Sequence, residues 1–239
     1  MGGSQTISTG EPSNLMCPGS FPRPVSQMLS VRSTTTLAAL CTVVATGTAA
    51  QTPPYSVTNG RILSAMQPEI RLDVDTALHY VGSQRWILYN VAQAEQHLFV
   101  QRAADGVERF LWVQFEEYIP SSNGRYDYSK DSPVAAFGKE LRTSKQLWNV
   151  PTTEARPESD GAYSRKLLRE HGITLPPQML YERFIYLPDT TRRRELMVIY
   201  AERATAAAAA LPKDKLDALL ADHERRGLRS FSITPQPRP

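Results

Sequence analysis

The residues best suited to chemistry lie in two stretches, 96–103 and 107–119, in which aliphatic side chains alternate with aromatic and polar ones. This alternation is typical of two β-strands. Aromatic walls with a few convergent polar groups are typical of small-molecule pockets, although an aromatic sheet face covered by a helix would show the same pattern. The sequence predicts a ligand-binding surface made by His97, Phe99, Trp112, Gln114, Glu116 and Tyr118.

The Asp105-Gly106 step between these stretches predicts a hairpin with a two-residue turn, because such turns need residues that tolerate positive φ. A turn at this step would pair Ala104 with Val107. Since side chains alternate between the two faces of a sheet, this register would place the candidate residues on one face and the aliphatic residues on the other. It would also pair Phe99 with Trp112, His97 with Gln114, and Glu95 with Glu116.

In this register Glu95 and Glu116 would have Cβ atoms about 5 Å apart. When two carboxyl groups lie at that distance, ionising both costs free energy because the negative charges repel. The pKa of one should therefore rise, as it does in acid–base pairs. This favours an alternative function, a carboxylate-dependent hydrolase or lyase using Glu116 with His97 or Glu95. No catalytic residue is assigned on the sequence alone.

Other chemical motifs are missing from the sequence. The four histidines, His79, His97, His171 and His223, are scattered without metal-ligand spacing, so we expect no metal site. Neither a nucleophile elbow nor a glycine-rich phosphate loop occurs, and we expect no cofactor.

Two arginine clusters stand out, residues 192–194 and the group of Arg225, Arg226 and Arg229. We interpret them as a solvated turn and a helix end stabilised by cations, in preference to sites for an anionic ligand. Aromatic residues do not alternate with these arginines, and the net charge of the chain is only +3. Nucleic acid is therefore not an expected partner.

The elements that would position the candidate residues are segregated along the chain. Strands are predicted near 85–89, at the hairpin, and at 181–187 and 195–200, the last apolar on both faces as a central strand would be. Helices are predicted for 132–148 after Ser132-Pro133, for 159–170 after the capping Ser159, and for 212–227. This order predicts an α+β fold, an antiparallel sheet with helices packed on one face. A parallel doubly wound sheet is the second choice and a barrel the third.

The first fifty residues are not expected to belong to the fold. Residues 1–27 are rich in Gly, Ser, Thr and Pro and are interpreted as disordered or as an upstream extension outside the translated protein. Residues 28–50 have a positive start, a short apolar run and a small-residue exit, which is typical of a signal peptide. Residues 51–239 would then form a single α+β domain with a Pro-rich C-terminal tail, in the periplasm or secreted.

The functional expectation is a non-enzymatic exported domain that binds a small molecule or an envelope protein through the aromatic-polar face of the hairpin. A purely structural envelope protein is a further alternative. With 41% apolar residues the composition is typical of a globular protein, and no apolar stretch is long enough to anchor the mature chain in a bilayer. Oligomeric state is not predicted.

If residues 28–50 are a signal peptide, protein recovered from its host should begin at or near Gln51. Intact-mass measurement with N-terminal sequencing checks this. A chain that still begins at Met1 would contradict export.

Overall fold

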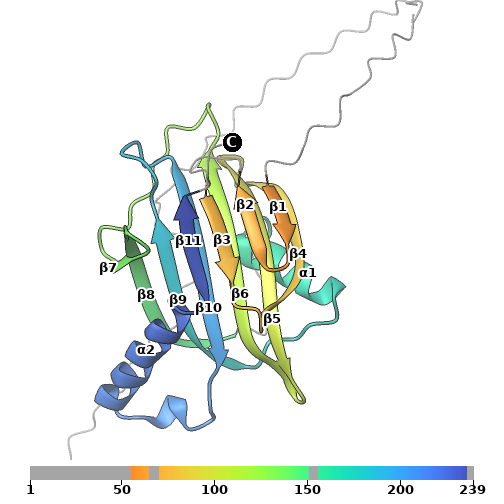
Figure 1. Ribbon diagram of the computed structural model, residues 1–239, viewed down its shortest axis with the longest axis vertical. Helices are drawn as coiled ribbons and strands as arrows, with labels where there is room; N and C mark the ends of the chain where they lie inside the picture. Colours follow the sequence, from red (N-terminus) through yellow and green to blue (C-terminus); the bar gives the residue numbers. More distant parts are fainter. Residues whose placement is uncertain (1–54, 65–69, 151–155, 236–239) are drawn as a thin grey trace, which may run out of the picture.

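The computed structural model describes residues 55–64, 70–150 and 156–235, which form two antiparallel sheets and two helices (Figure 1). The predicted extension 1–27, the predicted signal peptide 28–50 and residues 236–239 of the tail lie outside the described residues. In spatial order the large sheet consists of β4 (His79–Leu88), β5 (Ala92–Ala103), β6 (Gly106–Tyr118), β10 (Arg194–Arg203), β9 (Gln178–Tyr186), β8 (Lys139–Asn149) and β7 (Ser132–Ala136).

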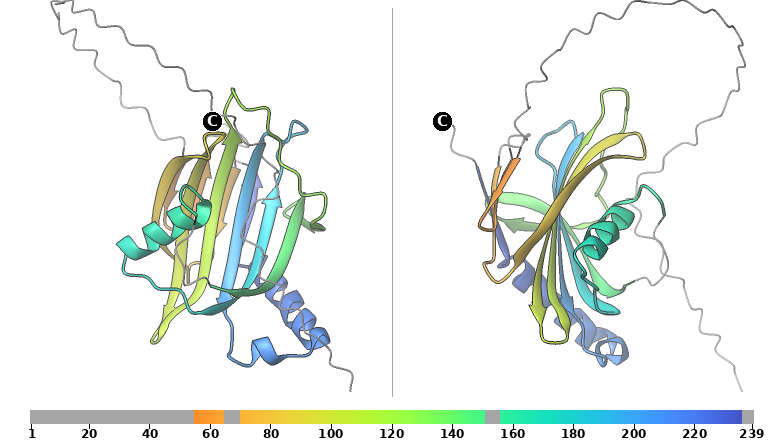
Figure 2. Two further views of the ribbon diagram at one scale, coloured as in Figure 1. Left: turned by 180° about the vertical axis from the view of Figure 1, so that it is seen from behind. Right: turned by 90° about the vertical axis from the view of Figure 1, so that its right-hand side faces the viewer.

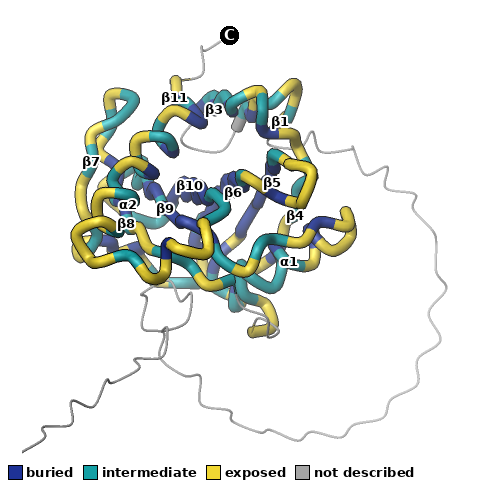
Figure 3. Tube along the Cα trace, turned by 90° about the horizontal axis from the view of Figure 1, so that it is seen from below, coloured by how far each residue is buried: buried dark blue, intermediate teal, exposed yellow. Residues whose placement is uncertain are grey.

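A smaller sheet packs against the large one, with the strand order β1 (Tyr55–Thr58), β2 (Arg61–Ser64), β3 (Ile70–Val74) and β11 (Phe231–Pro235). The small sheet covers one face of the large sheet, and helix α1 (Asp160–Glu170) covers the other (Figure 2). Seen from below, the buried strands of the large sheet form the middle layer between β3 and β11 on one side and α1 on the other (Figure 3). Helix α2 (Lys213–Gly227) follows a short 3-10 helix, Ala208–Ala210.

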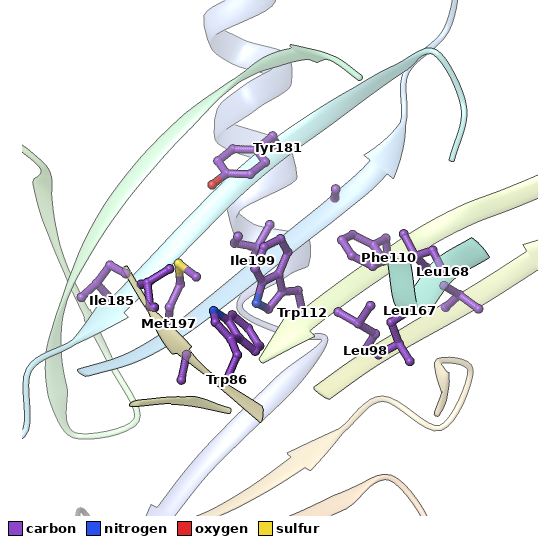
Figure 4. Close-up of a cluster of buried hydrophobic side chains, with 14 of the residues drawn as sticks. Trp86, Leu98, Phe110, Trp112, Leu167, Leu168, Tyr181, Ile185, Met197 and Ile199 are labelled. Atoms are coloured by element: carbon purple, nitrogen blue, oxygen red, sulfur yellow. The ribbon is translucent and has the colours of Figure 1, made fainter. Parts of the chain in front are cut away.

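Each face of the large sheet has its own hydrophobic core. Between the sheets, Ile62 and Leu72 of the small sheet belong to one cluster with Phe99 and Leu111 of the large sheet. On the opposite face, Leu167 and Leu168 of α1 lie over Leu98 and Phe110, near Trp86 and Trp112 (Figure 4). Because side chains alternate along a strand, neighbouring residues of β5 and β6 belong to different cores.

The predicted antiparallel sheet is confirmed, but the two helices are not on one face. The His223 ring of α2 stacks on Tyr200 at 5.1 Å between centroids, and Gly227 lies against Phe184 and Tyr200. Tyr200 and Phe184 belong to the core shared by the two sheets, so α2 lies on the small-sheet side. The molecule is a mainly β structure with a helix on each face.

Several predicted elements are confirmed. Strand β10 is the middle strand of seven and is buried on both faces from Glu195 to Ala201. Helix α1 begins after Ser159, whose side chain accepts a hydrogen bond from the Ala162 N–H, as expected of an N-cap. Helix α2 follows Pro212 and ends at Gly227.

The predicted helix at 132–148 is wrong, because this segment forms the hairpin β7–β8. Phe137 and Gly138 occupy its turn with φ of 55° and 69°, the positive pair that a tight hairpin turn needs. Leu141 and Trp148 would share a face in a helix, but in β8 they belong to different cores. The apolar spacing of 132–148 is compatible with a helix, but the positive φ values at Phe137 and Gly138 form a turn that a helix cannot contain.

Replacing Gly138 by Ala distinguishes a helix from a hairpin at 132–149, because the free energy of unfolding should change in opposite directions in the two structures. In a helix this change would raise the free energy of unfolding by about 1 kcal/mol. In the turn we expect it to lower that free energy by about 1 kcal/mol, since a Cβ disfavours φ of 69°. Apart from the two chain neighbours, no atom of the described residues lies within 4 Å of the place that the new Cβ would occupy, so the loss would come from the backbone alone. Urea denaturation measures it, with Gly138→Asn as a control that tolerates positive φ.

Candidate functional site

The hairpin of β5 and β6 forms as predicted, but its register differs by one residue from the expected one. The turn closes with Ala103 opposite Gly106, and beyond Gln101 opposite Arg109 the strands continue with Val100 opposite Phe110. Trp112 therefore pairs with Leu98, and Gln114 pairs with Gln96. The predicted pairs of Trp112 with Phe99 and of Gln114 with His97 are wrong.

Two local features produce this difference. The turn lies one residue earlier than predicted, which moves the pairing by two positions and would leave every side chain on its expected face. A β-bulge then interrupts the ladder, since Arg102 pairs with Val107 but Gln101 pairs with Arg109, leaving Glu108 as the extra residue. The bulge moves the pairing back by one position, so the net shift from the predicted register is one residue. Because side chains alternate between the faces, a shift of one residue changes which residues of the two strands share a face.

The six predicted ligand-binding residues consequently divide between the two faces of the large sheet. Trp112 and Tyr118 belong to the core beneath α1. Gln114 and Glu116 alternate with them along β6 and lie on the same face. His97 and Phe99 face the small sheet, where Phe99 belongs to the inter-sheet core and the His97 ring contacts Phe115 edge-on at 6.1 Å.

The predicted Glu95–Glu116 pair does not form, because Glu95 pairs with Phe115 and lies on the small-sheet face. The Glu95 carboxylate contacts His97 Nε2 at 2.9 Å and accepts a hydrogen bond from Arg85 Nε at 2.5 Å. The sheet backbone thus separates Glu116 from both His97 and Glu95. The catalytic arrangement considered from the sequence would need these groups on one side.

Glu116 instead pairs with another carboxyl group, that of Glu195, directly opposite on β10. Both residues are 2% exposed. Asp160, the first residue of α1, approaches the same place, because Gln114 Nε2 donates to its Oδ1 at 3.1 Å. We call Glu116, Glu195 and Asp160 the buried carboxyl cluster. Neither Glu195 nor Asp160 is among the residues predicted from the sequence.

A row of glutamines leads from the edge of the sheet to this cluster. Gln84 on β4 donates to Gln96 on β5 at 2.7 Å, and Gln96 donates to Gln114 on β6 at 3.3 Å. The Gln114 carbonyl also accepts from Trp112 Nε1 at 2.7 Å, which leaves its amide nitrogen to donate to Glu116 and Asp160. The orientation of Gln114 is fixed by these partners, so it presents donors to the carboxyl groups.

The loop 119–131 adds two tyrosines to the cluster. Tyr126 donates to Glu116 Oε2 at 2.9 Å, and Tyr128 donates to Glu195 Oε2 at 2.6 Å. Arg193 holds this loop in place by donating to the carbonyls of residues 118, 119, 122 and 124. Gly124 is required there, since a Cβ would collide with the Tyr118 ring. The arginines at 192–194 therefore include one that serves the internal structure.

Burial dominates the electrostatics of the cluster. Burial, and secondarily the charges of Glu195 and Asp160, raise the pKa of Glu116 well above its usual range, against the opposing hydrogen bonds from Gln114 and Tyr126. Burial likewise raises the pKa of Glu195 to about 8 and that of Asp160 to about 6. At neutral pH the cluster therefore holds protons that exposed carboxyl groups would release.

Arg183 of β9 is a cation close to Glu195, and it stacks on the Tyr128 ring at 5.3 Å and donates to Asp131 at 2.8 Å. Its charge opposes the rise in the pKa of Glu195 without cancelling it. Within the described residues Glu195 Oε1 accepts no hydrogen bond, and Arg183 Nε and Trp86 Nε1 donate none. Buried polar groups without partners are rare in folded proteins, so these three atoms are unusual among the described residues.

The cluster can hold protons, and in this conformation Glu116 and Glu195 are closed to solvent, whereas Asp160 is half-buried. Gln114 is fully buried, and α1 and the loop 119–131 cover the carboxyl groups. In the part of the chain that the structure describes, no three His, Cys, Asp or Glu side chains converge as metal ligands. The arrangement can hold protons and can accept a hydrogen bond at Glu195 Oε1.

Comparison of the chain with models of known families, with curated proteins and with solved structures finds no match in any of the three. Support for a function of the candidate site therefore comes from its geometry alone. Within the described segments no helix is long and apolar enough to cross a membrane.

Replacing Glu195 by Gln should flatten the dependence of stability on pH. Between the unfolded pKa near 4.5 and the folded pKa of about 8, the native state keeps a proton that the unfolded state has released. Native stability therefore falls as pH rises through this window, by about 1.4 kcal/mol per pH unit for one proton. Gln mimics the protonated form, so the variant should lose this slope and be the more stable protein at pH 8.

Glu117→Gln is the matched control, because Glu117 lies next to the cluster in sequence but is half-exposed and paired with Arg194. Its pH profile should resemble that of the wild type. Urea denaturation from pH 5 to pH 9 measures both variants. Equal slopes for Glu195→Gln and the wild type would show that Glu195 is not protonated in the native state.

Proposed function

We propose that this protein is a non-enzymatic binding domain whose ligand is a small organic cation, such as an amine, held between the large sheet and α1. The observation that carries the proposal is the buried carboxyl group of Glu195, which lies opposite Glu116 and leaves its Oε1 without a donor among the described residues. A bound ammonium group would supply that donor and would offset the negative charge of the ionised cluster.

The aromatic residues around the cluster support a cationic ligand. The rings of Tyr118 and Tyr126 lie 4.6 Å apart, and those of Tyr126 and Tyr128 lie 6.4 Å apart and nearly parallel. Aromatic faces attract organic cations through their ring quadrupole, and the attraction strengthens where water is excluded. Carboxyl groups surrounded by tyrosines thus favour an amine over an anion or an uncharged sugar.

Entry of the ligand would require α1 or the loop 119–131 to move, since both cover the cluster. Helix α1 is held over the sheet by the stack of Tyr163 on Trp86, 4.3 Å between centroids, and by Leu167 and Leu168. A single short helix with few anchoring side chains is the kind of element that can open locally at low cost.

The place of action is also a proposal. We infer that the domain acts in the periplasm or outside the cell, and the support is the signal-peptide pattern of residues 28–50. Because the candidate partners then include envelope proteins, the amine could be a side chain or a free metabolite.

A thermal-shift series with tetramethylammonium, choline and putrescine tests the ligand class, with acetate and glucose as comparison solutes. At a concentration 100-fold above Kd, a ligand specific for the native state stabilises it by about 2.7 kcal/mol, which is a readily measured rise in Tm. We expect such a rise with at least one amine, and expect it to grow from pH 6 to pH 8 as the cluster gives up protons.

Glu195→Gln should abolish the amine-induced rise, since it removes the charge at constant size, and Trp112→Ala should reduce it by loosening Gln114. Glu117→Gln should keep the rise. An amine-induced shift that Glu195→Gln leaves intact would place the binding site elsewhere, and a response only to acetate or glucose would exclude a cationic ligand.

A further inference from the structure

A second site lies on the opposite side of the large sheet, in a cleft of about 470 Å³. One side is formed by the large sheet, with Arg109 of β6 and Tyr200 and Glu202 of β10. The other side is formed by Asp75, which follows β3, by Ser230, which precedes β11, and by Arg226 near the end of α2. The Asp75 N–H donates to the Ser230 carbonyl at 2.8 Å, which holds these two residues of one side together. Such a volume is within the range of small-molecule sites.

The β-bulge of β6 shapes this cleft. Glu108, the extra residue, and its neighbour Arg109 both line it, although adjacent residues of a regular strand point to opposite faces. Bulges commonly redirect side chains next to functional sites. The β-bulge that changed the predicted register of β5 and β6 therefore also brings an acidic and a basic side chain to one wall of the cleft.

Two arginines in the cleft are held in fixed positions by carboxylates. Asp75 binds Arg109 Nη1 at 2.7 Å, and Arg109 Nε donates to Gln101. Glu202 accepts hydrogen bonds from Arg226 Nε at 2.9 Å and from Arg226 Nη2 at 2.6 Å. An arginine carries five N–H donors, and these contacts use only part of them. Each guanidinium is thus oriented without being saturated.

Glu202 acts as a support for the cleft and not as an acid–base group. Burial disfavours its charge, but hydrogen bonds with His223, Arg226 and Tyr200 lower its pKa to about 2. It therefore stays ionised at any physiological pH and keeps Arg226 in place. The fully buried His223 Nδ1 lies 3.3 Å from the same carboxylate and links it to α2.

Arg229 supplies charge that the rest of the described chain does not neutralise. Its side chain lines the cleft just after α2 and is exposed, and it has no ion pair with any described residue. Of the acidic lining residues, Asp75 and Glu202 are paired within the cleft, and Glu108 lies 3.3 Å from Arg203 outside it. The lining thus carries three acidic and three basic side chains, and Arg229, which has no ion pair with a described residue, lies next to two oriented guanidinium groups.

From these observations we propose that the cleft binds a small anion through a carboxylate or phosphate group, with Arg229 as its ionic partner and Arg109 and Arg226 as oriented donors. Planar guanidinium groups match the oxygen atoms of both anions, and the bond is stronger for charged partners. The arginines at the end of α2, interpreted from the sequence as stabilising the helix end, thus differ in role. Arg225 pairs with Asp222 on the helix surface, whereas Arg226 and Arg229 face the cleft.

NMR titration of the full ¹⁵N-labelled chain with inorganic phosphate and with malonate tests the proposal, observing the arginine Nε–Hε signals. We expect the signals of Arg226 and Arg229 to shift saturably with at least one of the two probes. Arg229→Gln should weaken that binding about tenfold, the loss expected for one charged hydrogen bond. Arg225→Gln, which removes the same charge from the same end of α2, should bind like the wild type.

The two probes also separate the two possible ligand classes. Binding of malonate alone indicates an organic carboxylate, and binding of phosphate alone or of both indicates a phosphate-bearing ligand or a general anion site. Equal weakening in both variants, shifts reproduced by sodium chloride at the same ionic strength, or no saturable shift with either probe would overturn the proposal. Neither variant touches the buried carboxyl cluster, so these outcomes are independent of the proposed amine site.

Discussion

The β-bulge at Glu108 is the constraint on which both candidate sites depend. It adds one residue to β6 opposite Gln101 and Arg102, and so decides which residues of β6 face α1. With the bulge, Gln114 and Glu116 lie beneath α1 beside Glu195, while Arg109 faces the small sheet. Moving the pairing by one place would exchange these sets, because a strand has a side-chain period of two.

The buried carboxyl cluster is costly for the fold, and its environment reduces that cost only in part. A carboxylate moved from water to the interior loses hydration that two or three hydrogen bonds do not fully replace. Gln114, Tyr126 and Tyr128 provide donors, but the direct pairing of Glu116 with Glu195 means that both cannot be ionised without strong repulsion. Apolar residues at these two positions would pack between β6 and β10 without this penalty, so the carboxyl groups contribute something other than stability.

A comparable cost is present under α2. Glu182 of β9 is fully buried, neither of its carboxyl oxygens has a hydrogen-bond partner among the described residues, and burial with the nearby charge of Glu224 raises its pKa to about 8. Lys145 acts in the opposite direction but is itself bound to Glu224. Protonation makes Glu182 tolerable at neutral pH, and alkaline conditions should weaken the docking of α2.

The sequence predicted the elements whose signals are local. The Ser159 cap, the amphipathic pattern after Pro212 and the doubly apolar stretch at β10 each report on a single segment, and all three were right. The hairpin at 132–149 was missed because apolar residues four and eleven apart also fit a helix, and the positive φ at Phe137 was not visible in a residue that rarely adopts it. The glycine of the Phe137-Gly138 step was the local feature that favoured a turn over a helix.

The sequence predicted several residues of the candidate site, but it did not predict which neighbouring residues they would contact. Trp112, Gln114, Glu116 and Tyr118 do share a face, since that follows from the alternation within one strand. Their partners could not be predicted, because the register with β5 depends on a bulge that no local residue pattern announces, and the neighbour β10 is about eighty residues away in sequence. A single glutamate beginning the otherwise apolar run of β10 was the one available signal for Glu195.

The two sites share strands but not an environment. Strands β6 and β10 carry Glu116 and Glu195 toward α1, and the same strands carry Arg109 and Tyr200 toward the small sheet. The layer between the two sites is a hydrogen-bonded sheet whose middle strand is buried from Glu195 to Ala201, and such buried core strands are the last parts of a protein to open locally. The sheet is therefore best understood as a partition between the two sites: α1 covers the carboxyl cluster on one side, and the end of α2 contributes Arg226 to the wall of the cleft on the other.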